Sequence, residues 1–201
     1  MRGSRLLAAS GVLLLGCGGG DGGAPVTGSD PSCPALVTPV PNEGWSHAPE
    51  GSPVSYRANP PASGPHYAVW ARYQEHTTAV ARPYWVHNLE HGAIVFLYRP
   101  DAPAAVVSAL RDAYRSLPND PACGHRRALL TPDPALPRAT AVVAADFVVA
   151  ADCVNAGLIR DFATGRRGLG PEQVCQDGSR ASLSWGVLAA HPPDPPLAPR
   201  E

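Results

Sequence analysis

Three histidines of this 201-residue chain lie within its two most distinctive segments. His87 and His91 lie four residues apart with Glu90 between them, and His66 ends a proline-rich loop. Imidazoles four residues apart share a face on a helical turn, and they also share a face on a strand. Three imidazoles that leave one coordination position open are a recognised ligand set for Zn or Cu. We therefore expect His66, His87 and His91 to bind a Zn or Cu ion.

Three roles are open to Glu90 in such a site. Its carboxylate could be a ligand, could orient a ligand from the second shell, or could be the base that acts on metal-bound water. The string His-x-x-Glu-His also occurs in metalloproteases in which one long helix supplies both ligands and the base. Here Gly92 and an apolar run over residues 93–98 follow at once, so there is no room for a long helix and the string alone is weak evidence.

A purely structural interpretation competes with the metal site. His87 would fix the loop before the strand and Glu90 would pair with Arg72 or Arg82, because buried polar groups are commonly held by hydrogen bonds alone. The third histidine, on its own loop, shifts the balance towards metal binding. The remaining histidines are predicted to be solvated or capping residues: His47, His76, His125 and His191.

The loop that precedes His66 has a restricted backbone. Three prolines remove three backbone donors and fix φ, and a glycine permits positive φ. Neither a regular helix nor a central strand can form there, so we expect a rigid, shaped loop of the kind that often holds a site. The residues predicted to shape it are Pro60, Pro61, Ser63, Gly64 and Pro65.

The rest of the chain predicts the order strand, helix, strand, strand, helix. Apolar runs indicate strands over Ala93–Tyr98, Arg127–Thr131 and Thr140–Ala151. Apolar residues at helical spacing indicate helices capped by Asp101 and Asn155. We expect an α+β fold with a small mixed sheet and helices on one face, preceded by a long loop region rich in proline and aromatic residues.

The N-terminus predicts an anchored protein of the bacterial cell envelope. Two arginines precede the apolar run Leu6–Leu15, which is too short to span a bilayer and is typical of a signal peptide. The run ends in Leu14-Leu15-Gly16-Cys17, the pattern of a lipobox, in which Cys17 is lipidated and becomes the first residue. A plain secretory signal with an incidental cysteine is the other interpretation. The predicted segments are a signal peptide (1–16), a flexible linker (17–43), one globular domain (44–175), a C-terminal extension (176–190) and a proline-rich tail (191–201).

Four further cysteines favour two disulfides. An even number in an oxidising compartment makes disulfides the expected state, and no CxxC spacing supports a thiolate metal site. Four cysteines allow three pairings, and a bond from Cys153 to Cys175 is plausible because they flank a predicted helix. The four are Cys33, Cys123, Cys153 and Cys175.

Composition excludes other classes of protein. All 16 cationic side chains are arginine and the net charge is −1, so the basic excess of a nucleic-acid surface is missing. A hydrophobic content of 44% argues against a wholly disordered chain. No glycine-rich phosphate loop follows a strand and no Gly-x-Ser-x-Gly turn occurs, so neither a nucleotide nor an organic cofactor is indicated.

Two long segments carry a resemblance to a known family. Residues 56–67 contain Pro-Pro-Ala-Ser-Gly-Pro-His, and residues 86–92 read Val-His-Asn-Leu-Glu-His-Gly ahead of a strand. Over about Gly44 to Val174 the chain resembles the uncharacterised domain-of-unknown-function family 3105. That resemblance implies an extracytoplasmic location, often with a signal or membrane anchor, and it implies no activity.

Three functions remain as hypotheses. The first is a lipid-anchored domain that binds a transition metal, and the second is a metal-dependent hydrolase with Glu90 as base. The third is a non-catalytic interaction module for a protein partner in the envelope, with an aromatic face of Trp45, Tyr67, Trp70, Tyr84 and Trp85. The chain has neither a nucleophile turn nor a second carboxylate–histidine pair, which favours binding over catalysis.

Overall fold

The computed structural model describes residue 30 and residues 32–179. The predicted signal peptide, Cys17, His191 and the proline-rich tail lie outside the described residues. A five-stranded mixed sheet has the order β1-β7-β6-β4-β5, in which only β4 and β5 are parallel neighbours. Its strands are β1 (Val37–Pro39), β4 (Ile94–Tyr98), β5 (Ala128–Pro132), β6 (Thr140–Ala144) and β7 (Phe147–Ala151). The sheet confirms the α+β class.

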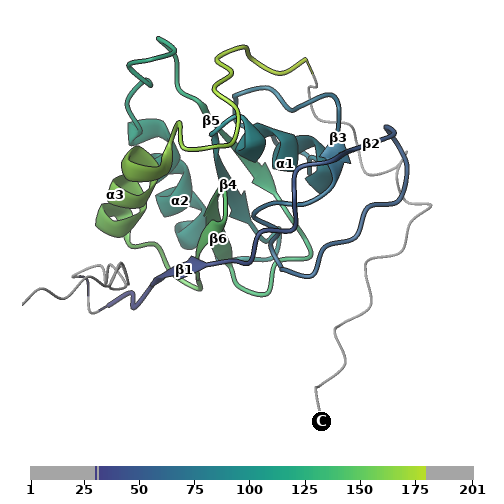
Figure 1. Cartoon of the computed structure of the whole chain (residues 1–201). Helices are drawn as coiled ribbons and strands as arrows, with labels where there is room; N and C mark the ends of the chain where they lie inside the picture. The colour runs from purple at the N-terminus through teal and green to yellow at the C-terminus, as the bar shows by residue number, and fades with distance from the viewer. Residues whose placement is uncertain (1–29, 31, 180–201) are drawn as a thin grey trace, which may run out of the picture.

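Helices cover both faces of this sheet. The two predicted helices, α2 (Ala104–Ser116) and α3 (Ala156–Arg166), share one face, as Figure 1 shows. Against them Ile94 and Phe96 of β4 pack with apolar residues of both helices. A third helix, α1 (Arg82–Glu90), lies on the opposite face against Val95 and Leu97.

Helix α1 was not predicted from the sequence. Every residue from Pro83 to Glu90 is buried, so the helix has no solvated face to create an amphipathic pattern. Pro83 stands in the first turn, where its missing N–H costs no hydrogen bond. The helix ends at Glu90, and Gly92 follows with φ +74° before β4 begins. The helix therefore includes His87 and ends just before His91, and strand β4 follows the histidine pair instead of a long helix.

Of three local predictions, two are wrong and one is confirmed. The single strand over Thr140–Ala151 is wrong, because the chain turns back at Asp146, which has φ +62°, and forms the β6–β7 hairpin. The cap assigned to Asp101 is also wrong, since its carboxylate binds Arg99 and α2 has no side-chain cap. The Asn155 cap is confirmed, because its Oδ1 accepts a hydrogen bond from Leu158 N at 3.0 Å.

Two disulfides connect distant parts of the chain. Cys33 is bonded to Cys153 and Cys123 to Cys175, so the pairing suggested between Cys153 and Cys175 is wrong. Cys33 is buried, and β1 pairs with β7, so part of the segment assigned to a linker belongs to the sheet. The two bonds indicate an oxidising, extracytoplasmic environment. Among the described helices, none has the length and apolar character needed to cross a membrane.

The loop before α1 covers the second face of the sheet. Within it β2 (His47–Ala48) and β3 (His66–Tyr67) form a short parallel pair. Gly64 has φ +119°, and a Cβ there would meet the Tyr56 ring at 2.9 Å, so glycine is required. Ser63 fixes the other side of the loop, since its Oγ accepts a hydrogen bond from Glu43 N. The loop therefore holds β3 rigidly beside α1.

Candidate metal centre

His66 enters the centre from β3 with its tautomer fixed by the backbone. Its ring is fully buried, and Nδ1 lies 2.9 Å from the carbonyl oxygen of Gly64. Because a carbonyl only accepts hydrogen bonds, Nδ1 carries the proton and donates it. In the neutral ring, Nε2 then has a lone pair, and it lies 3.0 Å from Oε2 of Glu90.

His87 enters from α1 in the same manner. Its Nδ1 donates to the carbonyl oxygen of Tyr67 at 2.6 Å, so the lone pair of the neutral ring is again on Nε2. Nε2 lies 3.7 Å from Oε2 of Glu90, one helical turn further along. Burial, aided by the neighbouring histidines, lowers the pKa of His87 to about 4, so the ring is neutral at pH 7.

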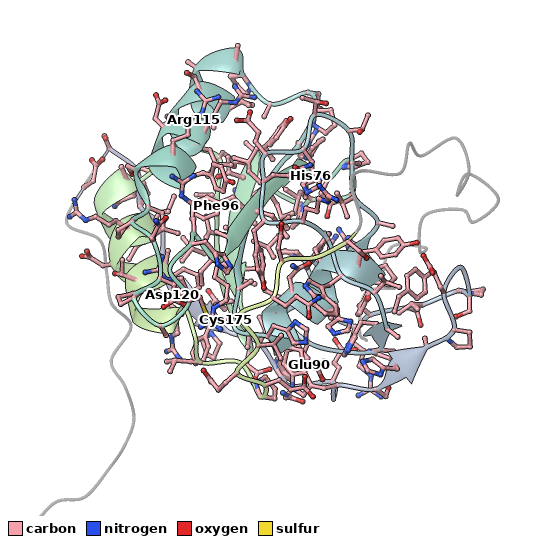
Figure 2. All side chains as sticks on the ribbon, turned by 90° about the horizontal axis from the view of Figure 1, so that it is seen from above. His76, Glu90, Phe96, Arg115, Asp120 and Cys175 are labelled. Atoms are coloured by element: carbon pink, nitrogen blue, oxygen red, sulfur yellow. A yellow bond between two sulfur atoms is a disulfide. The ribbon has the colours of Figure 1, made fainter. Side chains whose placement is uncertain are left out.

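Glu90 is the acidic group on which these nitrogens converge. Its side chain is only 7% exposed, and burial raises its pKa while His66 acts in the opposite direction. Figure 2 shows Glu90 on the side of the molecule away from Arg115 of α2. The structural interpretation paired Glu90 with Arg72 or Arg82, but Arg82 binds Asp133 at 3.0 Å and Glu90 contacts histidines.

His47, which sequence analysis assigned to a solvated or capping role, joins the group. It is the register partner of His66 in the β2–β3 pair, and its Nε2 lies 3.9 Å from Oε2 of Glu90. The ring centroids of His66 and His87 lie 5.0 and 5.1 Å from that of His47. The His47 side chain is 55% exposed, so the group has one side open to solvent. Only the pairing of two distant short strands brings it here, and no local sequence pattern could have indicated that.

These four residues form a cluster that could hold a metal ion. One donor atom from each of His47, His66, His87 and Glu90 lies within 4.8 Å of the others. Four donors bound to one zinc at tetrahedral geometry lie about 3.3 Å apart. The distances to Glu90 Oε2 run from 3.0 to 3.9 Å, close to that spacing. Imidazole nitrogens with a carboxylate oxygen suit Zn, Cu and similar transition metals.

His91, the third predicted ligand, lies at the edge of this cluster. It follows α1 directly, and its Nε2 is 3.1 Å from His87 Nε2 and 3.3 Å from Glu172 Oε2. Burial lowers the pKa of His91 to about 4, with further lowering by nearby His66 and Arg127. A second group of donors, overlapping the first at Glu90, consists of Glu90, His91 and Glu172. The three predicted ligands are thus close together but divided between two groups.

The surroundings of the cluster are partly as predicted. Pro60, Pro61, Ser63 and Gly64 are buried and Pro65 is half-buried. The prediction for His76 is wrong, because the ring is buried and its Nε2 donates to the carbonyl of Arg72. His125 is half-buried, with Nδ1 donating to the carbonyl of Cys123.

The aromatic residues do not form one exposed face. Tyr67, Tyr84 and Trp85 are buried in the core between α1 and the sheet. Trp70 is half-buried, and its ring lies 4.9 and 4.6 Å from the rings of His87 and His91. Trp70 therefore covers part of the two imidazoles.

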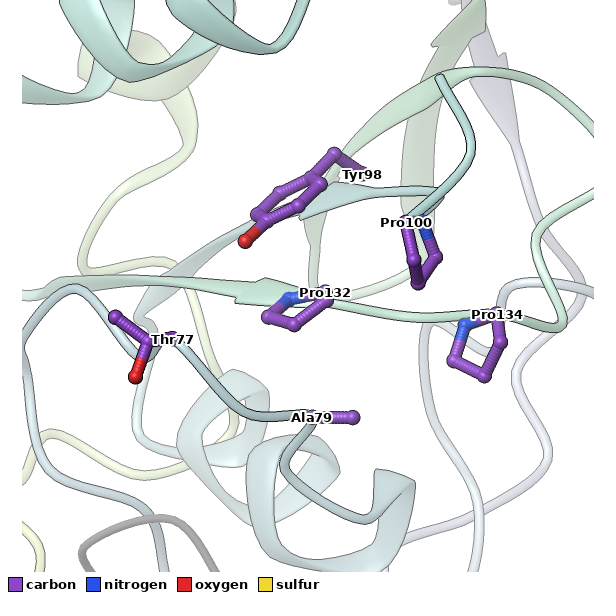
Figure 3. Close-up of a pocket in the computed structure, with 6 residues that line it drawn as sticks. All are labelled: Thr77, Ala79, Tyr98, Pro100, Pro132 and Pro134. Atoms are coloured by element: carbon purple, nitrogen blue, oxygen red, sulfur yellow. The ribbon is translucent and has the colours of Figure 1, made fainter. Parts of the chain in front are cut away.

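A separate depression of about 390 Å³ lies elsewhere on the molecule. Figure 3 shows Tyr98 and Pro132, at the ends of β4 and β5, in its wall. The other lining residues are Thr77, Ala79, Pro100 and Pro134. Tyr98 is its one titratable lining residue, so it offers neither metal ligands nor a catalytic pair, and the histidine cluster is the better candidate.

A comparison with known families finds a match that includes the two unusual segments. The model of the family described as "Protein of unknown function (DUF3105)" matches residues 47–178, which include every residue of both donor groups. The chain belongs to this family. Neither the curated proteins nor the solved structures include a match.

Proposed function

We propose that this member of the DUF3105 family binds one transition-metal ion, Zn²⁺ or Cu²⁺, through His47, His66, His87 and Glu90. The observation that carries the proposal is the convergence of lone pairs. Backbone carbonyls accept the Nδ1 protons of His66 and His87, so in the neutral rings both Nε2 lone pairs face the Glu90 carboxylate. A bound cation converts this mutual repulsion into coordination.

A proton on an imidazole could also relieve the repulsion, but burial opposes this at His87. Charging the ring of His87 requires a pH near 4, because burial disfavours the imidazolium. Burial acts the other way on Glu90 and raises the pKa of its carboxyl, so a metal ion has to compete with a proton there. The carbonyls of Gly64 and Tyr67 are the second-shell acceptors that commonly orient histidine ligands on metals. The arrangement therefore supports a preformed metal site over a hydrogen-bonded core.

Glu90 is better placed as a ligand than as a catalytic base. Its Oε2 lies within 4 Å of three different imidazole nitrogens, at 3.0, 3.7 and 3.9 Å. A base would have to stand beside a water on the metal, not among the ligands. We therefore favour metal binding over hydrolysis.

Titration calorimetry of the untagged full chain with Zn²⁺ and Cu²⁺ tests the proposal. His47→Ala, His66→Ala and His87→Ala should each weaken binding by about 100-fold or more, beyond the usual effect of losing a second-shell partner. Glu90→Gln should also weaken binding, whereas a catalytic base would leave affinity intact. The control is His125→Ala, which should bind as the wild type does. A wild-type chain without saturable binding, or an equal loss at His125, would overturn the proposal.

We further propose that the domain is anchored to the bacterial envelope through lipidated Cys17. The supporting observations are the Leu14-Leu15-Gly16-Cys17 pattern and the two disulfides of the folded domain. Cys17→Ser should remove the chain from the detergent phase on partitioning or leave an uncleaved precursor. Unchanged partitioning and processing would refute the anchor without affecting the metal site.

A further inference from the structure

We propose that a second divalent cation binds beside the first, between Glu90, His91 and Glu172, with the Glu90 carboxylate shared by the two ions. This inference rests on the proposed function, since it places a second ion next to the proposed first one. One donor atom from each of these three residues lies within 4.8 Å of the others. A carboxylate has two oxygens and about four lone-pair positions, so Glu90 can serve both ions.

His91 is the residue that a single-ion site leaves unexplained. It is 2% exposed, and its Nδ1 is buried with no hydrogen-bond partner among the described residues. If Nε2 carries the proton, Nδ1 is a buried acceptor without a donor. If Nδ1 carries it, the Nε2 lone pair faces the lone pair of His87 at 3.1 Å and the Glu172 carboxylate at 3.3 Å. Neither tautomer satisfies both nitrogens. In the second, a cation at Nε2 removes the repulsion there, while Nδ1–H stays a buried donor without an acceptor among the described residues.

Glu172 reaches this position through backbone packing. Its N–H donates to the carbonyl of Glu90 at 3.0 Å, and Gly168 N donates to the carbonyl of Gly92 at 2.8 Å. At Gly170 a Cβ would meet the Glu90 carbonyl oxygen at 2.2 Å, so only glycine lets the chain lie this close to the end of α1. These contacts fix residues 168–172 directly against the residues that supply His91 and Glu90.

A disulfide fastens the same segment just beyond Glu172. Cys175 is bonded to Cys123, and Figure 2 shows Cys175 and Glu90 on the same side of the molecule. The buried Arg127 also holds the segment, because its Nη1 lies 3.4 Å from the carbonyl of Val174 and 3.1 Å from that of His91. Its positive charge is paired with Asp120 at 2.8 Å, which reduces its repulsion of a nearby cation.

The donor types indicate which cations fit the second position. Two carboxylates and one imidazole form a harder ligand set than the three imidazoles of the first position, which favours Mn, Fe, Co or Zn over Cu(I). The Glu172 side chain is 54% exposed, so water can complete the coordination. Paired ions in proteins commonly lie about 3.5–4 Å apart, a separation that a shared carboxylate can span.

Cobalt(II) titration of the untagged, oxidised full chain tests the second site. We expect two Co²⁺ ions per chain by elemental analysis and magnetic coupling between them by electron paramagnetic resonance. Glu172→Gln should reduce the stoichiometry to one and abolish the coupling, while the metal-free protein keeps its thermal stability. The matched control is Asp161→Asn, an exposed carboxylate on α3 that should leave two coupled ions.

The outcomes separate this inference from the proposed function. One ion per wild-type chain, or two ions that persist in Glu172→Gln, would overturn the second site and leave the first intact. The second site would also be overturned if the wild type binds one ion and Glu172→Gln binds that ion with lower affinity. Glu172 would then only adjust the affinity of the first site. No bound cobalt at all would overturn the second site, whereas the Zn²⁺ and Cu²⁺ titrations decide the first site separately. His47→Ala should act in the opposite sense, weakening the first ion while Glu90, His91 and Glu172 retain the second.

Discussion

The two faces of the central sheet differ in the side chains that are buried against them. The face under α2 and α3 buries apolar side chains, with Phe96 and Tyr114 in edge-to-face contact at 5.5 Å. The face under α1 buries a comparable apolar core, but the far side of that helix also buries His87, Asn88 and Glu90. Apolar burial stabilises the first face by itself, whereas burying polar groups costs free energy unless each finds a partner. We therefore expect the second face to reach its full stability only when its converging donors bind a metal ion.

Neighbouring residues of β4 offer the sharpest test of this difference. Phe96 faces α2 and Leu97 faces α1, and both are fully buried. Phe96→Ala should reduce the free energy of unfolding by about 3–5 kcal/mol, and Leu97→Ala by about 2–5 kcal/mol. Only Leu97→Ala should weaken Zn²⁺ binding, because it removes support from the helix that carries His87 and Glu90. Urea unfolding and calorimetry on both variants measure this, and equal loss of affinity would show that the faces are not independent.

Metal should stabilise the chain through the α1 face alone. A ligand present at about 1,000 times its Kd raises the free energy of unfolding by about 4 kcal/mol if it binds only the folded state. We expect this gain from Zn²⁺ in the wild type and in Phe96→Ala, measured by thermal unfolding with and without the metal. At the same metal concentration His87→Ala, with its affinity weakened about 100-fold or more, should keep at most about 1.4 kcal/mol of this gain. The same gain in His87→Ala would place the bound metal elsewhere.

Acid should destabilise the metal-free protein through the same face. The unfolded chain has histidine pKa values near 6.5, whereas burial lowers those of His87 and His91 to about 4. Between pH 6.5 and 4 the unfolded state therefore binds more protons, so the free energy of unfolding falls as the pH decreases. A fall in pKa from 6.5 to about 4 corresponds to a loss of about 3 kcal/mol for one ring, and the two rings together contribute more than one alone. Glu90, whose pKa is raised by burial, acts in the opposite sense and offsets part of it.

Urea unfolding in the presence of a chelator at pH 7 and pH 4.5 measures this effect. Saturating Zn²⁺ should make the dependence on pH steeper, because protons then compete with the metal for the imidazoles. A metal-free protein whose stability is the same at both pH values would contradict the neutral, buried state of the two histidines.

The sequence predicted the apolar face well and the α1 face only in part. Regular spacing of apolar residues located α2 and α3, because each has one face in the core and one in solvent. It could not locate α1, whose polar and apolar residues are buried alike. The β6–β7 turn was also missed, since Asp146 adopts positive φ where a glycine would have been the usual signal.

Some residues of the candidate site could be recognised from the sequence and others could not. His66, His87, Glu90 and His91 were recognised by residue type and spacing, and the structure brings all four together. His47 and Glu172 were not, since one arrives by the pairing of β2 with β3 and the other by the packing of a glycine-rich segment against α1. Those contacts depend on the completed fold, and no local pattern encodes them.

The smallest expected effect belongs to a cap on the apolar face. Asn155 Oδ1 accepts a hydrogen bond from Leu158 N, so Asn155→Ala should cost about 1 kcal/mol and Asn155→Gly only a few tenths. Asn155 caps α3, whereas Asn88 of α1 binds both backbone groups of Ala71 on the side of the sheet that carries the histidine cluster. Asn155→Ala should therefore shift the midpoint of thermal unfolding and leave the affinity for Zn²⁺ unchanged. A loss of Zn²⁺ affinity in Asn155→Ala would show that destabilising α3 also disturbs the proposed metal ligands on the other side of the sheet. The two faces would then form one cooperative unit.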